Sequence, residues 1–323
     1  MIPIIYIAAN QYSGSTLLAF LLNAHPNITS AGHTTGWEGL TGEFMCSCGS
    51  TLSSCPFFTA VRRRFDAEDL PFWFDGYLPT KYTISDWNRL DRIVFENLPK
   101  IRSARLEHAR DGLVRKLPKV RRAVEATDRA NIAFIRGALS YADASVYVDN
   151  SHSPYRARRL AEIPEFRVRP LHLVRDVRGV ALSTHRNLGW SMGFTALHWV
   201  RVQEQIIRVL KATPAFAGAT TNYRDIVVHY EDLCDRPKAT METLVRPLGQ
   251  TAPDDWPSFK EVEHHILGNR MRFDPGVVRK SERWRTELRE STCRAIEDRC
   301  RRYARRSPYR SALNRILDTM FEA

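Results

Sequence analysis

The chain has 323 residues, 43% of them hydrophobic, and a formal net charge of +12 at pH 7. This composition excludes a disordered chain, and the length predicts one domain over residues 1–323. The positive net charge suits a phosphorylated cofactor. No RNA-binding or zinc-finger pattern points to nucleic acid. No run approaches the roughly 18–20 apolar residues of a membrane span, and no basic segment precedes the first apolar run, so we expect a cytoplasmic protein.

The first element is a short run of β-branched and aromatic residues, Ile4–Ala8, which predicts a buried strand. Residues 13–15 break this run, and Thr16–Leu22 then predicts a buried helix. A strand, a glycine turn and a helix form an opening that binds phosphate, because the free N–H groups of the helix start hold an anion. Gly14 lets the backbone approach the phosphate closely, and the neighbouring hydroxyls of Ser13, Ser15 and Thr16 add donors. The loop lacks the lysine of a Walker A motif.

Residues 32–140 predict an insertion that shapes the acceptor site. Its first part is dense in Gly, Cys, Ser and Pro, and residues 86–140 are charged and periodic, which indicates helices. Cys46, Cys48 and Cys55 form a cluster that supplies part of a zinc site if His33 is the fourth ligand. The spacing matches no strong zinc signature, so we instead predict a reduced loop, or one disulfide between Cys48 and Cys55, and no metal.

Strands and helices alternate through the rest of the chain. The predicted strands are Val146–Val148, Leu171–Val174 and Ile226–His229, the helices between and after them are Val177–Arg186, Thr195–Lys211 and Pro237–Leu248, and an arginine-rich helix begins at Ser291. This alternation predicts an α/β fold with a parallel β-sheet flanked by helices.

Two further motifs carry polar groups that suit a nucleotide. Arg175 follows a predicted strand, at the sheet edge where open α/β sheets bind ligands, and Ser183 lies eight residues later on the next helix. An arginine and a hydroxyl so placed are able to converge on one phosphate. The third motif begins at Tyr230, in the sequence Tyr-Glu-Asp-Leu after the last predicted strand, where an aromatic ring is able to stack on a base.

Together these three ordered motifs, which extend from residue 4 to about 249, resemble those of the PAPS-dependent sulfotransferase superfamily. The resemblance implies a P-loop-like sulfotransferase fold and transfer of the sulfuryl group of 3′-phosphoadenosine 5′-phosphosulfate (PAPS) to an acceptor, with adenosine 3′,5′-bisphosphate as product. The acceptor would be a hydroxyl of a small molecule, carbohydrate or lipid.

The resemblance also implies roles for individual residues. Residues 12–16 would hold the phosphosulfate, Arg175 and Ser183 the 3′-phosphate, and Tyr230 would lie near the adenine. The family has a late glycine and basic loop that closes over the 3′-phosphate; residues 268–273 match it, which makes Arg270 or Arg272 a candidate, with Arg279 and Lys280 as the alternative.

The catalytic groups depart from the family in one respect. The family has lysine or arginine before the Ser-Gly of the loop, whereas this chain has Tyr12, a hydrogen-bond donor without charge. His152 follows the second predicted strand, in the region where the family has a basic residue, and imidazole suits the acceptance of a proton; Glu38 and Glu43 are the alternative bases. The competing functions are a P-loop-type kinase and a catalytically weak or inactive nucleotide-binding protein that keeps the cofactor pocket.

Overall fold

The computed structural model describes residues 1–84, 88–96, 103–251, 264–266, 268, 270–273 and 278–321. Five parallel strands form its central sheet, in the spatial order β2-β5-β1-β6-β7. Their bounds are β1 Ile2–Ala9, β2 Ile28–Ser30, β5 Val146–His152, β6 Phe166–Val174 and β7 Val227–His229. The predicted fold class, a parallel sheet flanked by helices, is therefore confirmed.

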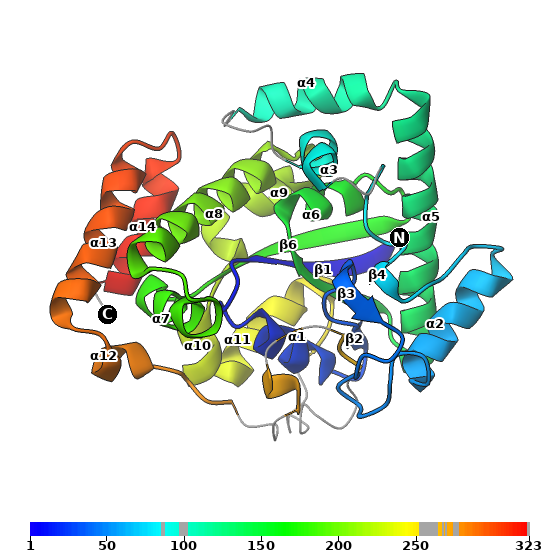
Figure 1. The fold of residues 1–323 in the computed structure, drawn as a ribbon, viewed down its shortest axis with the longest axis horizontal. Coiled ribbons are helices and arrows are strands. Elements are labelled where there is room, and N and C mark those ends of the chain that lie inside the picture. The colour runs from blue at the N-terminus through cyan, green and yellow to red at the C-terminus, as the bar shows by residue number, and fades with distance from the viewer. Residues whose placement is uncertain are drawn as a thin grey trace.

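Both faces of the sheet are buried. On β1, Ile4 and Tyr6 lie in one hydrophobic core, and Ile5 and Ile7 lie in the other, because successive side chains of a strand point to opposite faces. Helices α6 (Pro154–Leu160) and α8 (Met192–Ala212) cover the first face, and α1 (Ser15–Asn23) and α11 (Pro237–Val245) cover the second (Figure 1). This double cover explains why β1 is apolar along its whole length.

Where it is described, the predicted insertion contains a small two-stranded antiparallel sheet and four helices. The strands are β3 (Gly36–Thr41) and β4 (Asp75–Tyr77), and the helices are α2 (Pro56–Ala67), α3 (Asn88–Phe95), α4 (Ala104–Val114) and α5 (Pro118–Ala142). Helix α2 packs tightly on α5 at Gly137. A Cβ at this position of α5 would lie only 3.0 Å from the Cα of Val61 on α2. The helices predicted over 86–140 are confirmed where that stretch is described, whereas the short strands β2, β3 and β4 were not predicted.

The carboxyl-terminal half supplies the remaining elements. They are α7 (Val177–Leu188), α9 (Ala217–Thr220), α10 (Tyr230–Asp235), α12 (Arg283–Glu287), α13 (Glu290–Arg305) and α14 (Arg310–Phe321), with short 3-10 turns at Pro214–Phe216, Tyr223–Ile226, Arg246–Leu248 and Arg270–Phe273. Figure 1 shows α13 and α14 as a pair of helices beside α7 and α8. Within the described residues, no helix combines the length and apolar character needed to cross a bilayer.

Candidate functional site

The turn between β1 and α1 has the geometry of an anion-binding loop. Gly14 adopts φ +90°, and a Cβ at this position would lie 2.4 Å from Cδ2 of Tyr230, so only glycine fits here. The Oγ of Ser13 is buried and has no hydrogen-bond partner among the described residues. A buried hydroxyl left unpaired is costly, and an anion seated on the loop would satisfy it.

The structure brings the arginine of the second motif to this same loop. Strands β1 and β6 pair in parallel, with Ala9 beside Leu173, so both strands end at the same edge of the sheet. From there, Nη1 of Arg175 donates to the backbone oxygen of Tyr12 at 2.8 Å. Segments that lie 163 residues apart in the chain thus meet in one place.

The neighbouring helix α7 begins beside the same guanidinium. A Cβ at Gly179 would lie 3.4 Å from Nε of Arg175, so the guanidinium lies over the first turn of α7. Ser183 follows four residues later and shares that face of the helix. The carboxylate of Asp176, the residue that follows Arg175, pairs with Arg178 at 2.6 Å.

Tyr230 links the loop to the segment after residue 277. Its ring lies under the guanidinium of Arg175, with 4.4 Å between the guanidinium carbon and the ring centre. Its hydroxyl donates to the backbone oxygen of Arg279 at 3.3 Å and accepts from the backbone N–H of Ser281 at 3.1 Å. Burial raises the pKa of Tyr230 to about 12, so the hydroxyl stays protonated. In this structure the ring therefore packs on Gly14 and Arg175.

His152 lies at the carboxyl end of β5, directly beside the loop. The pairing of β5 with β1 contains a bulge, because Tyr6 is paired with Asp149 but Ala8 is paired with His152. His152 itself adopts φ +66°, a conformation that is unfavourable for a residue with a Cβ. Its Nε2 lies 2.6 Å from Oγ of Ser15, within hydrogen-bond distance. The bulge and the strained backbone together aim the imidazole at the phosphate-binding loop.

Backbone strain also marks Tyr12, with φ +60°. Among the described non-glycine residues, the other positive φ values are at Asp69 and Asp143, and both of these follow the ends of helices. At helix ends a left-handed residue is ordinary, whereas in an active site it costs free energy that the surroundings must supply. The two strained residues away from helix ends are thus the two predicted catalytic residues.

The electrostatic surroundings keep His152 uncharged. Burial, followed by the nearby His33, lowers the pKa of His152 to about 3, although Asp149 acts in the opposite direction. The rings of His33 and His152 meet edge to face with 5.7 Å between their centres. Burial likewise lowers the pKa of His33 to about 4. Both imidazoles are therefore neutral at pH 7 and able to accept a proton.

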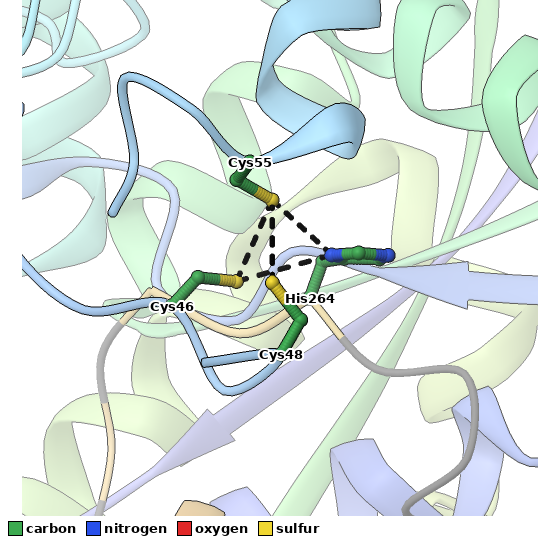
Figure 2. A group of neighbouring side chains, drawn as sticks. All are labelled: Cys46, Cys48, Cys55 and His264. Atoms are coloured by element: carbon green, nitrogen blue, oxygen red, sulfur yellow. Dashed lines mark hydrogen bonds between the residues drawn. The ribbon is translucent and has the colours of Figure 1, made fainter. Parts of the chain in front are cut away.

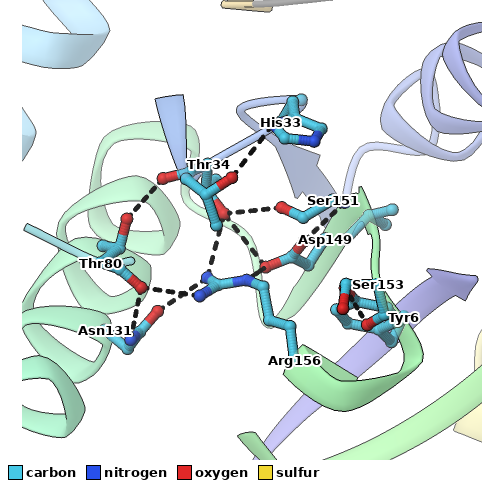
Figure 3. Close-up of polar contacts among 12 residues, drawn as sticks. Tyr6, His33, Thr34, Thr80, Asn131, Asp149, Ser151, Ser153 and Arg156 are labelled. Atoms are coloured by element: carbon cyan, nitrogen blue, oxygen red, sulfur yellow. Dashed lines mark hydrogen bonds and ion pairs between the residues drawn. The ribbon is translucent and has the colours of Figure 1, made fainter. Parts of the chain in front are cut away.

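A buried ion pair fixes the strand that carries His152 (Figure 3). Nε of Arg156 donates to Asp149 at 3.0 Å. The other guanidinium nitrogens donate to three residues of the insertion: the backbone oxygen of Thr80 at 2.7 Å, Oγ1 of Thr34 at 3.1 Å and Oδ1 of Asn131 at 2.7 Å. Because Asp149 also accepts from Thr34 and from the N–H of Ser151, the charges are fully hydrogen-bonded. This network anchors the insertion to the sheet edge beside the candidate base.

The remaining predicted site residues lie in different surroundings. Glu38 and Glu43 are both exposed, Glu38 on β3 and Glu43 just after it. Arg272 is buried, donates to the backbone oxygen of Ile266, and lies with its guanidinium 4.6 Å from the ring centre of Phe44. The side chain of Arg270 lies outside the described residues. A Cβ at Gly268 would lie 2.7 Å from Oγ1 of Thr16, so this late glycine does reach the phosphate-binding loop.

Two histidines at the site were not predicted from the sequence. His33 lies beside His152. His265 is buried against Gly32, and its Nε2 has no hydrogen-bond partner in the part of the chain that the structure describes. Neither histidine stands at a diagnostic spacing from another site residue. The available sequence signals were Gly32 and Gly268, because a glycine often marks a place where another group approaches the backbone closely. Both adopt positive φ in the structure.

The cysteine loop differs from its prediction. All six cysteines are free, so the alternative of a disulfide between Cys48 and Cys55 is wrong. His33 lies beside His152 and is not the histidine of this cluster; the three sulfurs instead meet His264.

Comparisons with known proteins give structural matches only. No protein-family model and no curated protein sequence matches the chain. Solved structures that match include a sulfotransferase domain from the Synechococcus PCC 7002 olefin synthase, at 16% identity and a TM-score of 0.39 over 92% of this chain and 94% of that one.

Two other matches are a sulfotransferase domain from the curacin biosynthetic pathway, at 14% identity and a TM-score of 0.44 over 92% of this chain and 97% of that one, and sulfotransferase STF9 from Mycobacterium avium, at 13% identity and a TM-score of 0.36 over 88% of this chain and 74% of that one. Each of the three is named as a sulfotransferase. At these identities and TM-scores the matches carry no residue role to this chain.

Proposed function

We propose that the protein is a sulfotransferase that uses PAPS and transfers its sulfuryl group to an acceptor hydroxyl of a small molecule, carbohydrate or lipid. The observation that supports this proposal best is the contact between Arg175 and the loop of residues 12–16, made by segments 163 residues apart. A donor with phosphates at both the 5′ and 3′ positions needs two anion sites close together. The loop offers one, and Arg175 with Ser183 on α7 offers the other.

The fit of the donor rests on groups that the protein leaves without partners. Within the described residues the buried Oγ of Ser13 has no hydrogen-bond partner, and α1 begins at the same place, so that the positive end of its dipole points toward a bound anion. When bound, PAPS supplies the reactive sulfuryl group, and the residues of this chain position it and stabilise its charge. Arg175 and Ser183 would distinguish it from ATP, which has no 3′-phosphate.

His152 would take the proton of the acceptor hydroxyl as its oxygen attacks sulfur and the bond from sulfur to the bridging phosphate oxygen breaks. Its imidazole is neutral, hydrogen-bonded to Ser15 of the loop and held by a strained backbone. A pKa of about 3 makes it a weak base. The negative charge of a bound donor raises that pKa, because a nearby anion favours the imidazolium. The base would thus become stronger as the donor binds.

A second function, nucleotide binding with weak or no catalysis, is favoured by Tyr12. This residue replaces the cation that the family uses to stabilise the leaving group, and a phenol carries no positive charge. Arg175 offers a replacement, because its Nη1 is 2.8 Å from the backbone oxygen of Tyr12. We therefore favour an active enzyme in which one arginine serves both the loop and the 3′-phosphate.

The insertion would form the acceptor side of the site. It lies next to His152 through the hydrogen bonds of Arg156 to Thr34, Thr80 and Asn131. The insertion is part of the single domain of residues 1–323 in this proposal, since its helix α5 contributes Phe134 and Ile135 to the same core as β1.

The experiment is a binding measurement with a matched variant. Arg175→Ala should weaken the binding of adenosine 3′,5′-bisphosphate by about 2 kcal/mol, or roughly 30-fold, because a charge-assisted contact is lost. Arg186→Ala is the control, because it also removes one guanidinium, that of a residue on α7 in an exposed ion pair with Glu287. Transfer of labelled sulfuryl groups from PAPS to a panel of hydroxyl acceptors then separates the enzyme from the inactive binding protein. Equal affinities of the two variants would contradict the proposed role of Arg175.

A further inference from the structure

Three side chains of the β3–α2 loop and one of the stretch 264–266 bring metal-binding atoms together. They are Cys46, Cys48, Cys55 and His264, and their ligand atoms all lie within 4.8 Å of one another (Figure 2). Cys55 directly precedes α2, and His264 begins the described stretch 264–266. Cys55 and His264 are 209 residues apart in the chain, so the cluster is a product of the fold rather than of a local motif.

The distances within the cluster match the edges of a tetrahedron around zinc. With Zn–S bonds of about 2.3 Å, two sulfurs on one ion lie ~3.8 Å apart, and a sulfur and a nitrogen lie ~3.5 Å apart. The sulfur of Cys55 lies 3.7 Å from that of Cys48 and 3.8 Å from that of Cys46. Nδ1 of His264 lies 3.2 Å from the sulfur of Cys55 and 3.9 Å from that of Cys46.

The backbone holds two of the thiols in a tight turn. The N–H of Cys46 donates to the oxygen of Ser50 at 2.9 Å, and the N–H of Gly49 donates back to the oxygen of Cys46 at 3.1 Å. Gly49 adopts φ +86°, which a residue with a Cβ rarely does. The turn therefore directs Cys46 and Cys48 to the same side without any help from a metal.

The ring of His264 is oriented by its neighbours. It stacks on Phe57 with 5.3 Å between ring centres and 16° between ring planes. Its Nε2 lies 3.3 Å from the hydroxyl of Tyr141, which leaves Nδ1 facing the sulfurs. A histidine that binds a metal through one nitrogen commonly has its other nitrogen hydrogen-bonded in this way.

We propose that these four residues bind one Zn²⁺ as a structural site, through three thiolates and Nδ1 of His264. Three sulfurs and one nitrogen in a tetrahedron are a ligand set that selects zinc over calcium and magnesium, which take oxygen ligands. Because all four positions are filled by protein, the ion has no open position for a substrate. Binding releases the thiol protons, so zinc affinity falls as the pH is lowered.

The ion would fasten the stretch 264–266 to the β3–α2 loop beside the phosphate-binding site. The two segments already share hydrogen bonds, since the N–H of His265 donates to Oγ of Ser47 at 2.8 Å and the N–H of Ser47 donates to the backbone oxygen of His265 at 3.3 Å. Just beyond them, Gly268 contacts Thr16 at the start of α1. Zinc would thus hold the late glycine over the loop, independently of whether the proposed function is correct.

The test is the zinc content of the purified chain and of matched variants. Elemental analysis should find one zinc per wild-type chain, and less than a tenth of that in Cys48→Ser and in His264→Asn. Cys293→Ser is the control, since that cysteine lies on α13 outside the cluster, and it should keep its zinc. Tyr141→Phe should weaken zinc binding about 10-fold through loss of the bond to Nε2.

Replacing zinc by Co²⁺ in the wild type keeps the test decisive if a variant fails to fold. Tetrahedral cobalt with thiolate ligands gives sulfur-to-metal charge-transfer bands in the near ultraviolet and intense visible bands. Any of three results would overturn the proposal. They are a wild type that contains no zinc after growth and purification with zinc, equal zinc contents in the control and the cluster variants, and a cobalt spectrum without sulfur-to-metal bands.

Discussion

A methyl group at position 14 should destabilise the loop between β1 and α1, and the structure sets the size of the effect. Gly14→Ala places a Cβ at φ +90° and 2.4 Å from the ring of Tyr230. The left-handed backbone costs a residue with a Cβ about 1–2 kcal/mol, and forcing atoms into a filled space costs about 1–3 kcal/mol more. We therefore expect a loss of about 2–5 kcal/mol in the free energy of unfolding.

Gly189→Ala is the matched control for this substitution. Gly189 also has a positive φ, +69°, but a Cβ there would meet nothing within 4 Å. It should lose only the backbone part, about 1–2 kcal/mol. Denaturant unfolding of both variants gives the difference, which measures the contact between position 14 and Tyr230.

Removal of the ring should relieve the clash. In a double-mutant cycle, Tyr230→Ala added to Gly14→Ala should cost about 1–3 kcal/mol less than the sum of the single losses. The affinity for adenosine 3′,5′-bisphosphate should fall in Gly14→Ala and not in Gly189→Ala, because only the first moves the phosphate-binding loop. Equal losses of stability in the two glycine variants, or additive effects in the cycle, would refute this account of the loop.

Three further outcomes follow from the site and the core. His152→Ala should lower the single-turnover rate of transfer by about 10²-fold and leave bisphosphate affinity nearly intact, whereas an unchanged rate would direct attention to Glu38→Gln and Glu43→Gln. Tyr12→Phe should lose more activity than Tyr12→Lys gains, and a Phe variant as fast as the wild type would show that the hydroxyl has no catalytic part. Burial lowers the pKa of His172 to about 4, although its bond to Gln203 opposes this, so its contribution to stability is present above pH ~6.5 and is lost as the pH falls toward 4. As the pH is lowered from 6.5 to 5, the free energy of unfolding should fall less steeply in His172→Gln than in the wild type, by about 1.4 kcal/mol per pH unit. Urea unfolding at several pH values measures both slopes, and identical slopes would contradict the assignment.

The central sheet and the loop between β1 and α1 were predictable because their signals are local. The apolar run of β1, the Ser-Gly-Ser break and the helix after it are adjacent in the chain, and the structure has them as β1, the loop and α1. The short strands β2, β3 and β4 were missed because three to six residues with few apolar side chains give no clear alternation.

The positions that depend on tertiary contacts could not be predicted. The cysteine spacing suggested a metal ligand set only in part, and the fourth residue, His264, lies 209 residues from Cys55. A nearby histidine in the sequence, His33, was the natural candidate, but the fold carries it to His152 instead. The bulge that aims His152 at Ser15 depends on how β5 is paired with β1, which no local pattern encodes.

The central claim is that Arg175 and the loop after β1 together select a nucleotide with phosphates on both its 5′ and 3′ positions. Calorimetric titration of the wild type at fixed ionic strength, first with adenosine 3′,5′-bisphosphate and then with AMP, tests it without knowledge of the acceptor. We predict that the bisphosphate binds at least ~30-fold more tightly than AMP, which corresponds to about 2 kcal/mol for the 3′-phosphate. Equal affinities for the two nucleotides, or no binding of the bisphosphate, would contradict the account.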